Sequence, residues 1–130
     1  MPSIEDVFAA TRQRVSSIAP HAAAALYEQG ALMVDTRSAA QREQFGMIPG
    51  AVLIERNVLE WRLDPACSHR HPAVSAHDQP IVVFCQEGYA SVLAVASLGE
   101  LGLTDVHDLA GGFEAWAAAG LPVLSAPSPR

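Results

Sequence analysis

Cys85 and the six residues after it form the segment of this chain that is best suited to covalent chemistry. The thiol directly follows residues 81–84, a continuous β-branched apolar run that predicts a buried strand. A helix is expected over residues 91–101, and the dipole at its N-terminus favours a thiolate over a thiol. Gly88 allows the intervening loop to curl, so that free N–H groups converge on an anion such as a persulfide, Cys–S–S⁻. Most free cysteines are merely small buried residues, but this strand–loop–helix context favours a reactive one.

Short apolar strands alternate with helical segments along the whole chain. Strands are expected at residues 31–34, 51–54, 81–84, 105–109 and 123–124, and helices from Ser3 onward, from Pro20 to Glu28, and over 37–45, 58–63, 91–101 and 113–119. Residues 64–79 contain two prolines and three histidines, which predicts a loop or lid. Alternation of this kind predicts a parallel sheet covered by helices on both faces, with the reactive site beyond the carboxyl ends of the strands.

Composition excludes several classes of function. The chain has 130 residues, half of them hydrophobic, which suits one domain. A net charge of −6 without a basic stripe argues against a nucleic-acid binder. Two cysteines, Cys67 and Cys85, are too few for a disulfide framework. The first residues lack the basic region of a signal peptide, and no apolar run reaches the ~18 residues of a membrane span. We therefore expect a reduced, cytoplasmic protein that binds neither nucleic acid nor membrane.

Four segments resemble the rhodanese family, in the family's order. Residues 34–37 resemble its D-x-R element, residues 46–51 its G-H-I-P-G-A element, residues 85–91 its active-site loop, and residues 111–123 its ending, G-G-F-x-A-W-x-x-A-G-L-P-V. The match spans residues 17–124, and the last segment is highly specific. We accordingly expect an N-terminal helical extension at 1–16, a rhodanese domain at 17–124 and a frayed tail at 125–130.

The resemblance implies a fold and a reaction. The fold is three-layer α/β/α, with a five-stranded, mainly parallel sheet. The reaction is that of a sulfurtransferase without a cofactor: Cys85 takes a sulfane sulfur from thiosulfate, a thiol persulfide or a protein persulfide, and passes it to a thiol or another nucleophilic acceptor. The backbone N–H groups of the active-site loop would stabilise the sulfur anion. That loop consists of Gln86, Glu87, Gly88, Tyr89, Ala90 and Ser91.

The loop departs from the family pattern in its charge. Many relatives carry Arg at the positions of Gln86 and Ala90, and Glu87 here adds a negative charge that opposes the helix dipole. Met47 also replaces the family's usual His. A dianion such as thiosulfate would therefore meet fewer cations, and we expect weak activity with thiosulfate.

Other residues are expected to position or support the site. Arg56 and Arg62 follow the second strand and are candidates for positioning an anionic substrate, although ion pairs of Arg56 with Glu55, Glu60 or Asp64 are an alternative. Asp35 and Arg37 are expected to have structural roles near the site, with Asp35 accepting backbone N–H bonds. Tyr89 either walls the pocket or covers it. Phe113 and Trp116 are expected to pack on the sheet.

Three other functions compete with an enzyme of this kind. A phosphatase needs an Arg six positions after the cysteine, where this chain has Ser91. Cys67, His69, His71 and His77 include metal-binding side chains, but their spacing matches no common zinc pattern, so no metal site is expected. Resolution of a Cys85 persulfide as a disulfide is an alternative role for Cys67. The strongest rival is a sulfur carrier or regulatory binding domain that has kept the fold without turnover.

Overall fold

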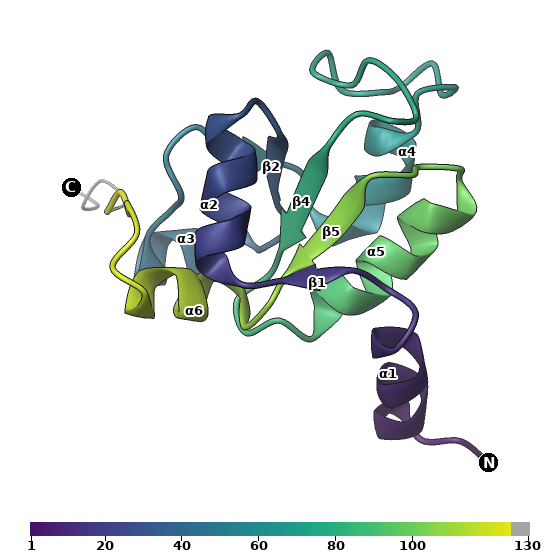
Figure 1. Ribbon diagram of the computed structural model, residues 1–130, viewed down its shortest axis with the longest axis horizontal. Coiled ribbons are helices and arrows are strands. Elements are labelled where there is room, and N and C mark those ends of the chain that lie inside the picture. Colours follow the sequence, from purple (N-terminus) through teal and green to yellow (C-terminus); the bar gives the residue numbers. More distant parts are fainter. Residues whose placement is uncertain (126–130) are drawn as a thin grey trace.

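Five short parallel strands form the centre of the computed structural model, which describes residues 1–125 (Figure 1). They are β1 (Ser17–Ile18), β2 (Leu32–Asp35), β3 (Val52–Leu53), β4 (Ile81–Phe84) and β5 (Val106–Leu109), in the order β1-β5-β4-β2-β3. All four pairings are parallel, which confirms the predicted sheet. The central strand, β4, is buried along its full length, which explains its continuous apolar sequence.

The fifth strand is not the one predicted from the sequence. Leu124 forms only an isolated antiparallel bridge with Met47, so the strand expected at 123–124 is wrong. The fifth strand is instead β1, at one edge of the sheet, whose two residues pair with Asp108 and Leu109. Two residues are too few to show the periodicity of a strand, which is why β1 escapes sequence analysis.

Six α-helices and one 3₁₀ turn connect the strands within the described residues. They are α1 (Ile4–Arg12), α2 (Pro20–Glu28), α3 (Ala39–Phe45), η1 (Arg56–Val58), α4 (Leu59–Leu63), α5 (Ala90–Glu100) and α6 (Gly112–Ala118). Reciprocal hydrogen bonds between Ser3 and Asp6 begin α1, so the predicted helix start is confirmed. Ser38 and Gln41 begin α3 in the same way. No helix among residues 1–125 has both the length and the apolar character that crossing a bilayer requires.

The core has two halves, one on each face of the sheet. On one face, α4 and α5 cover a cluster that includes Val83 and Leu98. On the other face, α2 and α6 cover a cluster that includes Phe84, and Phe113 and Trp116 pack there as expected. The predicted three-layer α/β/α architecture is confirmed (Figure 1).

Two segments lie outside these layers. Helix α1 packs against α5, beside the end of the sheet where the β4–α5 loop lies (Figure 1). Residues 64–79 form an irregular loop at the opposite end of the sheet, so they do not act as a lid over Cys85. This follows from the chain path, because the loop leads into the amino end of β4 and Cys85 leaves its carboxyl end. Apart from residue 125, the predicted frayed tail lies outside the described residues.

Candidate active site

Cys85 lies at the centre of a tight loop between β4 and α5. The backbone N–H groups of Gly88 and Ser91 donate hydrogen bonds to its Sγ, at 3.2 and 3.4 Å, and Ser91 Oγ lies 3.2 Å from the same sulfur. Gly88 has a φ of +91°, and a Cβ there would come within 2.8 Å of the Gly111 nitrogen, so only glycine fits. The loop therefore presents two amides and one hydroxyl to a single sulfur atom, an arrangement that stabilises a sulfur anion.

Backbone N–H groups at the start of α6 donate hydrogen bonds to this loop. The N–H of Phe113 donates to the Cys85 carbonyl at 2.9 Å, and the N–H of Glu114 donates to the Gln86 carbonyl at 3.1 Å. A Cβ on Gly112 would come within 2.6 Å of the Cys85 carbonyl oxygen. Both carbonyls are thus turned toward α6 and away from the sulfur.

The sulfur opens onto a cavity. Cys85 is 9 % exposed and forms part of the wall of a cavity of about 290 Å³. The other lining residues come from the segment after β2, from α3, from η1, and from the β4–α5 loop with the first residue of α5. They are Thr36, Arg37, Gln41, Arg56, Gln86, Glu87, Tyr89 and Ala90. A small sulfur compound can therefore reach the thiol from solvent.

Behind the sulfur, Ser91 connects Cys85 to a buried carboxyl group. Ser91 Oγ donates to Asp108 Oδ1 at 2.5 Å, and Ser17 Oγ donates to Asp108 Oδ2 at 2.8 Å. Asp108 is 1 % exposed. Burial raises its pKa above the ordinary 3.8, although the two hydroxyl donors and the charge of Arg12 pull it down in part. A buried carboxyl group in hydrogen-bond contact with the thiol's own partner is suited to accept a proton.

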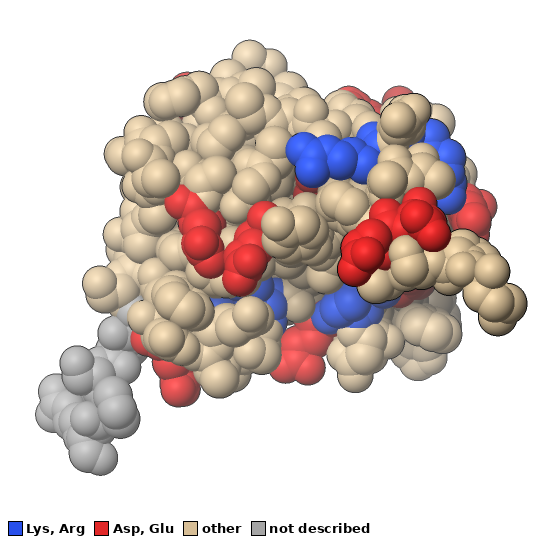
Figure 2. All heavy atoms as spheres, turned by 90° about the horizontal axis from the view of Figure 1, so that it is seen from below, with Lys and Arg blue, Asp and Glu red and all other residues tan. Residues whose placement is uncertain are grey.

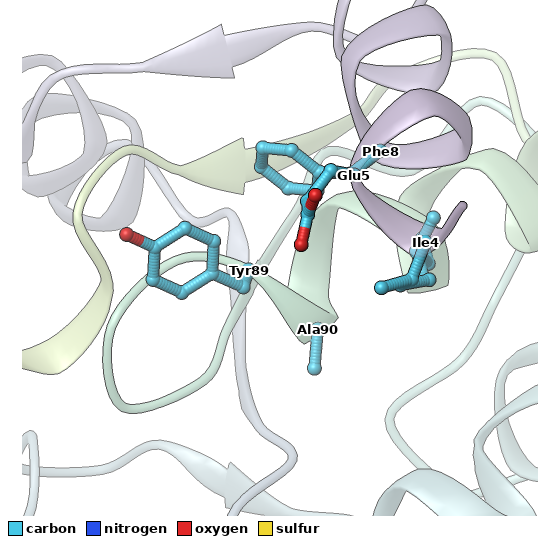
Figure 3. A pocket seen from close by; sticks show the side chains of 6 residues that line it. Ile4, Glu5, Phe8, Tyr89 and Ala90 are labelled. Carbon is cyan, nitrogen blue, oxygen red and sulfur yellow. The ribbon is translucent and has the colours of Figure 1, made fainter.

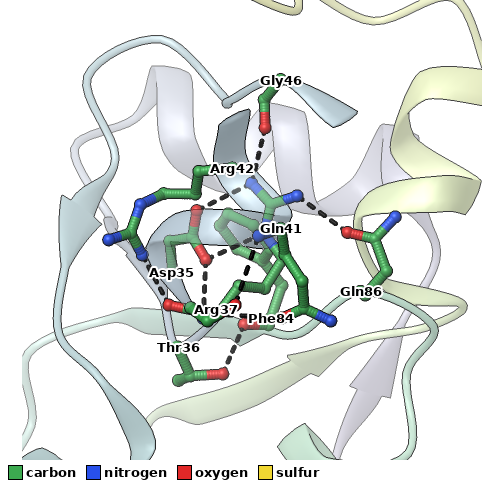
Figure 4. Close-up of polar contacts among 9 residues, drawn as sticks. Asp35, Thr36, Arg37, Gln41, Arg42, Gly46, Phe84 and Gln86 are labelled. Carbon is green, nitrogen blue, oxygen red and sulfur yellow. Dashed lines mark hydrogen bonds and ion pairs between the residues drawn. The ribbon is translucent and has the colours of Figure 1, made fainter. Parts of the chain in front are cut away.

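A second buried polar cluster is centred on Arg37, which lines the cavity of Cys85 (Figure 4). Its guanidinium donates twice to the Asp35 carboxylate, and also to Gln86 Oε1 at 2.9 Å and to the Gly46 carbonyl at 2.8 Å. It stacks 4.2 Å from the centre of the Phe113 ring. Asp35 also accepts the backbone N–H of Arg37, as a strand-end carboxylate is expected to do. Every group of this cluster is paired, so Arg37 has no free charge to offer a substrate.

The two predicted positioning arginines lie in different places. Arg56 lines the cavity but forms an ion pair with Glu60 at 2.8 Å, the alternative raised for it from the sequence. Arg62 does not line the cavity; it donates to the His69 carbonyl in the 64–79 loop. Cys67 lines a separate cavity with Glu60, Trp61, Asp64 and Leu101.

The remaining loop residues shape the mouth of the cavity. Gln86 is buried and held by Arg37, whereas Glu87 lines the cavity. Tyr89 is 60 % exposed and stands at the cavity wall rather than covering it. Figure 2, seen from the side on which this loop lies, shows acidic and basic side chains intermixed over a largely uncharged surface. No group of His, Cys, Asp or Glu suited to a metal ion occurs within residues 1–125.

Sequence reasoning missed Asp108 and Thr36. Asp108 pairs with Val83 in the register of β4 and β5, which sets its carboxyl close to the loop that begins at Cys85. The signal was available, since a carboxylate in the middle of an expected buried strand requires an explanation. Thr36 Oγ1 donates to the Phe84 carbonyl at 2.9 Å and lines the cavity.

Comparison with known proteins gives a consistent result. Residues 19–119 match the family model of the rhodanese-like domain. The thiosulfate sulfurtransferase GlpE of Pseudomonas savastanoi pv. phaseolicola is 38 % identical over 101 residues, which cover 78 % of this chain and 86 % of that protein. A sulfurtransferase of Allochromatium vinosum is 33 % identical over 72 % of this chain and 78 % of its own length. A solved structure from Rhodopseudomonas palustris, described as a protein of unknown function and possible tyrosine phosphatase, superposes with a TM-score of 0.84 at 29 % identity and covers 95 % of both chains.

Proposed function

The chain belongs to the rhodanese-like domain family, and from that premise we propose that it is a sulfurtransferase that carries a sulfane sulfur as a persulfide on Cys85. The observation that carries this proposal is the convergence of the Gly88 and Ser91 amides and the Ser91 hydroxyl on Sγ, at the wall of an open cavity. Its partners are, in general terms, a sulfur donor and a thiol acceptor. Because both described cysteines are free, we expect it to work in a reducing compartment such as the cytoplasm.

Transfer takes place in two half-reactions. The Cys85 thiolate attacks the outer sulfur of a donor R–S–SH; a new S–S bond forms, the donor's S–S bond breaks, and R–S⁻ leaves. An acceptor thiolate then attacks the outer sulfur of Cys85–S–SH, becomes the persulfide itself and releases the Cys85 thiolate. The loop amides stabilise the negative charge on the sulfur in both steps.

Ser91 and Asp108 supply a route for the thiol proton. The Cys85 S–H donates to Ser91 Oγ, and the Ser91 O–H donates to the Asp108 carboxylate. When the thiol proton passes to Ser91 and the Ser91 proton passes to Asp108, the thiolate accepts a hydrogen bond from the hydroxyl and the carboxyl becomes neutral. The raised pKa of Asp108, caused by burial, favours this transfer.

The charges around the cavity select against thiosulfate as the preferred donor. Both lining arginines are engaged, Arg37 with Asp35 and Arg56 with Glu60. Glu87 adds a negative charge to the cavity wall. A dianion would therefore find no uncommitted guanidinium among the lining residues, and weak turnover of thiosulfate is expected.

A tyrosine phosphatase, the activity suggested for the Rhodopseudomonas palustris structure, fits this site less well. Phosphate transfer needs a guanidinium that clamps the phosphoryl oxygens from the end of the loop. Here that position holds Ser91, whose hydroxyl is committed to Asp108. A buried carboxyl behind the nucleophile also opposes a dianionic phosphate.

Intact-mass spectrometry after incubation with a thiol persulfide tests the proposal. The wild-type chain should gain the mass of one sulfur atom, Cys85→Ser should gain none, and the matched control Cys67→Ser should behave as wild type. Addition of a thiol acceptor should remove the sulfur repeatedly, with turnover. Sulfur loading on Cys67 or no loading at all contradicts the proposal; loading without turnover favours the carrier rather than the enzyme.

A further inference from the structure

A second, apolar cavity adjoins the cavity of Cys85. It measures about 410 Å³ and is lined by Ile4, Glu5 and Phe8 of α1 and by Tyr89, Ala90 and Leu93 at the start of α5. Figure 3 shows Tyr89 on one side of this cavity and Ile4 on the other. Ile4 and Tyr89 are 65 % and 60 % exposed, so the apolar lining of this cavity faces solvent.

The two cavities share walls. Tyr89 and Ala90 line both, so the apolar cavity lies next to the cavity that contains the sulfur. The Tyr89 and Phe8 ring centres are 5.5 Å apart, which gives the apolar cavity an aromatic side. One ligand can therefore place a sulfur group at Cys85 and an apolar group against α1.

Helix α1 lies outside the part of the chain that matches the family model. It precedes residues 19–119, which match the family model, and it packs on α5. Arg12 lies 5.9 Å from the centre of the Phe8 ring. Three of the six residues that line the apolar cavity therefore precede the part of the chain that matches the family model, and three lie within it.

We propose that this cavity binds the uncharged, apolar substituent of a small organic persulfide, R–S–SH, the sulfur donor of Cys85. The inference rests on the proposed sulfurtransferase function and names its donor class. Charge supports it, because the arginines of the Cys85 cavity are paired and Glu5 and Glu87 disfavour an anionic substituent. Size supports it too: a few hundred Å³ is the volume of a small-molecule site, whereas a protein partner needs a face of roughly 800 Å².

The chemistry of loading is unchanged by the apolar group. The Cys85 thiolate attacks the outer sulfur, the donor's S–S bond breaks, and R–S⁻ leaves and takes up a proton from solvent. Burial of R against Ile4 and Phe8 contributes binding that a hydrophilic donor lacks, a factor of about four for each buried methylene.

The test compares benzyl and methyl persulfide, generated in situ, as donors in single-turnover loading of Cys85. We expect the second-order rate constant of loading for the benzyl donor to exceed that for the methyl donor by at least about tenfold. Ile4→Ser should reduce this ratio several-fold. Val7→Ser changes an exposed residue of the same helix that does not line the cavity, and should leave the ratio as in wild type.

A second measurement separates this inference from the proposed function. Benzyl mercaptan should bind to the Cys85→Ser variant, and Ile4→Ser introduced into that variant should weaken the binding. Equal loading by both donors, or a ratio that Ile4→Ser does not change, overturns the apolar site while leaving the sulfurtransferase proposal intact. Failure of every persulfide to load Cys85 overturns the proposed function and the donor assignment with it, whether or not the mercaptan binds.

Discussion

Two buried polar clusters flank Cys85, and they differ in how their charge is compensated. In the first, the Asp35 carboxylate faces the Arg37 guanidinium, and each of the three guanidinium nitrogens donates at least one hydrogen bond. In the second, the Asp108 carboxyl receives hydrogen bonds, among the described residues, only from the hydroxyls of Ser91 and Ser17. Both carboxyl groups are almost fully buried. Burial alone therefore does not reveal a role: the carboxylate paired with a buried guanidinium holds loops together, and the carboxyl that is only partly compensated is left able to exchange a proton.

The largest expected effect is on stability, from breaking the compensated cluster. Arg37→Met leaves the Asp35 carboxylate buried without its cation, and the free energy of unfolding should fall by about 3–5 kcal/mol. Urea denaturation measures the change. Arg14→Met, at an exposed position, is the matched control and should have little effect. A loss no larger than that of the control would show that the cluster is not a scaffold.

The next effect separates the second cluster from the first, because it should appear in chemistry rather than in stability. Asp108→Asn keeps the shape of the side chain but removes the proton acceptor, and the rate of sulfur loading at neutral pH should fall by roughly tenfold or more. The control is Asp105→Asn, whose partly exposed carboxylate contacts His107 instead. An unchanged loading rate would assign Asp108 a purely structural role.

Asp108→Asn should slow sulfur loading without lowering the stability of the protein at neutral pH. Because burial raises the pKa of Asp108, its protonated carboxyl contributes to the free energy of unfolding. This contribution is fully present below the ordinary pKa of 3.8 and is lost as the pH rises through the raised pKa. Asp108→Asn should therefore be as stable as wild type or more stable at neutral pH, and its advantage should shrink in acid. Thermal unfolding of variant and wild type, from below pH 3.8 to neutral pH, provides the measurement. The assignment would be contradicted if the stability of the variant relative to wild type were lower at neutral pH than in acid.

The smallest effect concerns a carboxylate that is not buried in either cluster. Glu87 lines the cavity, and Glu87→Gln should raise kcat/KM for thiosulfate by a factor of about five, equivalent to the ~1 kcal/mol of a screened charge pair. Added salt should reduce the difference. Glu100→Gln makes the same change in net charge at the far end of α5 and should have no effect. Equal gains from both variants would attribute the change to net charge alone.

The sequence predicts the layers and the nucleophile well because both depend on local patterns. The strand at residues 81–84 and the capped start of α1 are confirmed at their predicted residues. What it does not predict depends on register and side-chain partners. The alignment of Asp108 with Val83, which sets the carboxyl close to the thiol, does not follow from local patterning, whereas the Arg56–Glu60 pair, four positions apart, was among the partners that the sequence offered. Strand β1 is too short to detect and is held by its pairing with β5.

The sulfur-binding loop and the start of α6 form one structural unit, although they are distant in the sequence. Hydrogen bonds from Phe113 and Glu114 to the carbonyls of Cys85 and Gln86 join them. An engineer who transplants the loop into another scaffold would have to transplant Gly111 and Gly112 with it, because a side chain at Gly112 collides with the grafted backbone. Drift at either segment is constrained by the other, so substitutions that reshape this site are expected to arise in pairs.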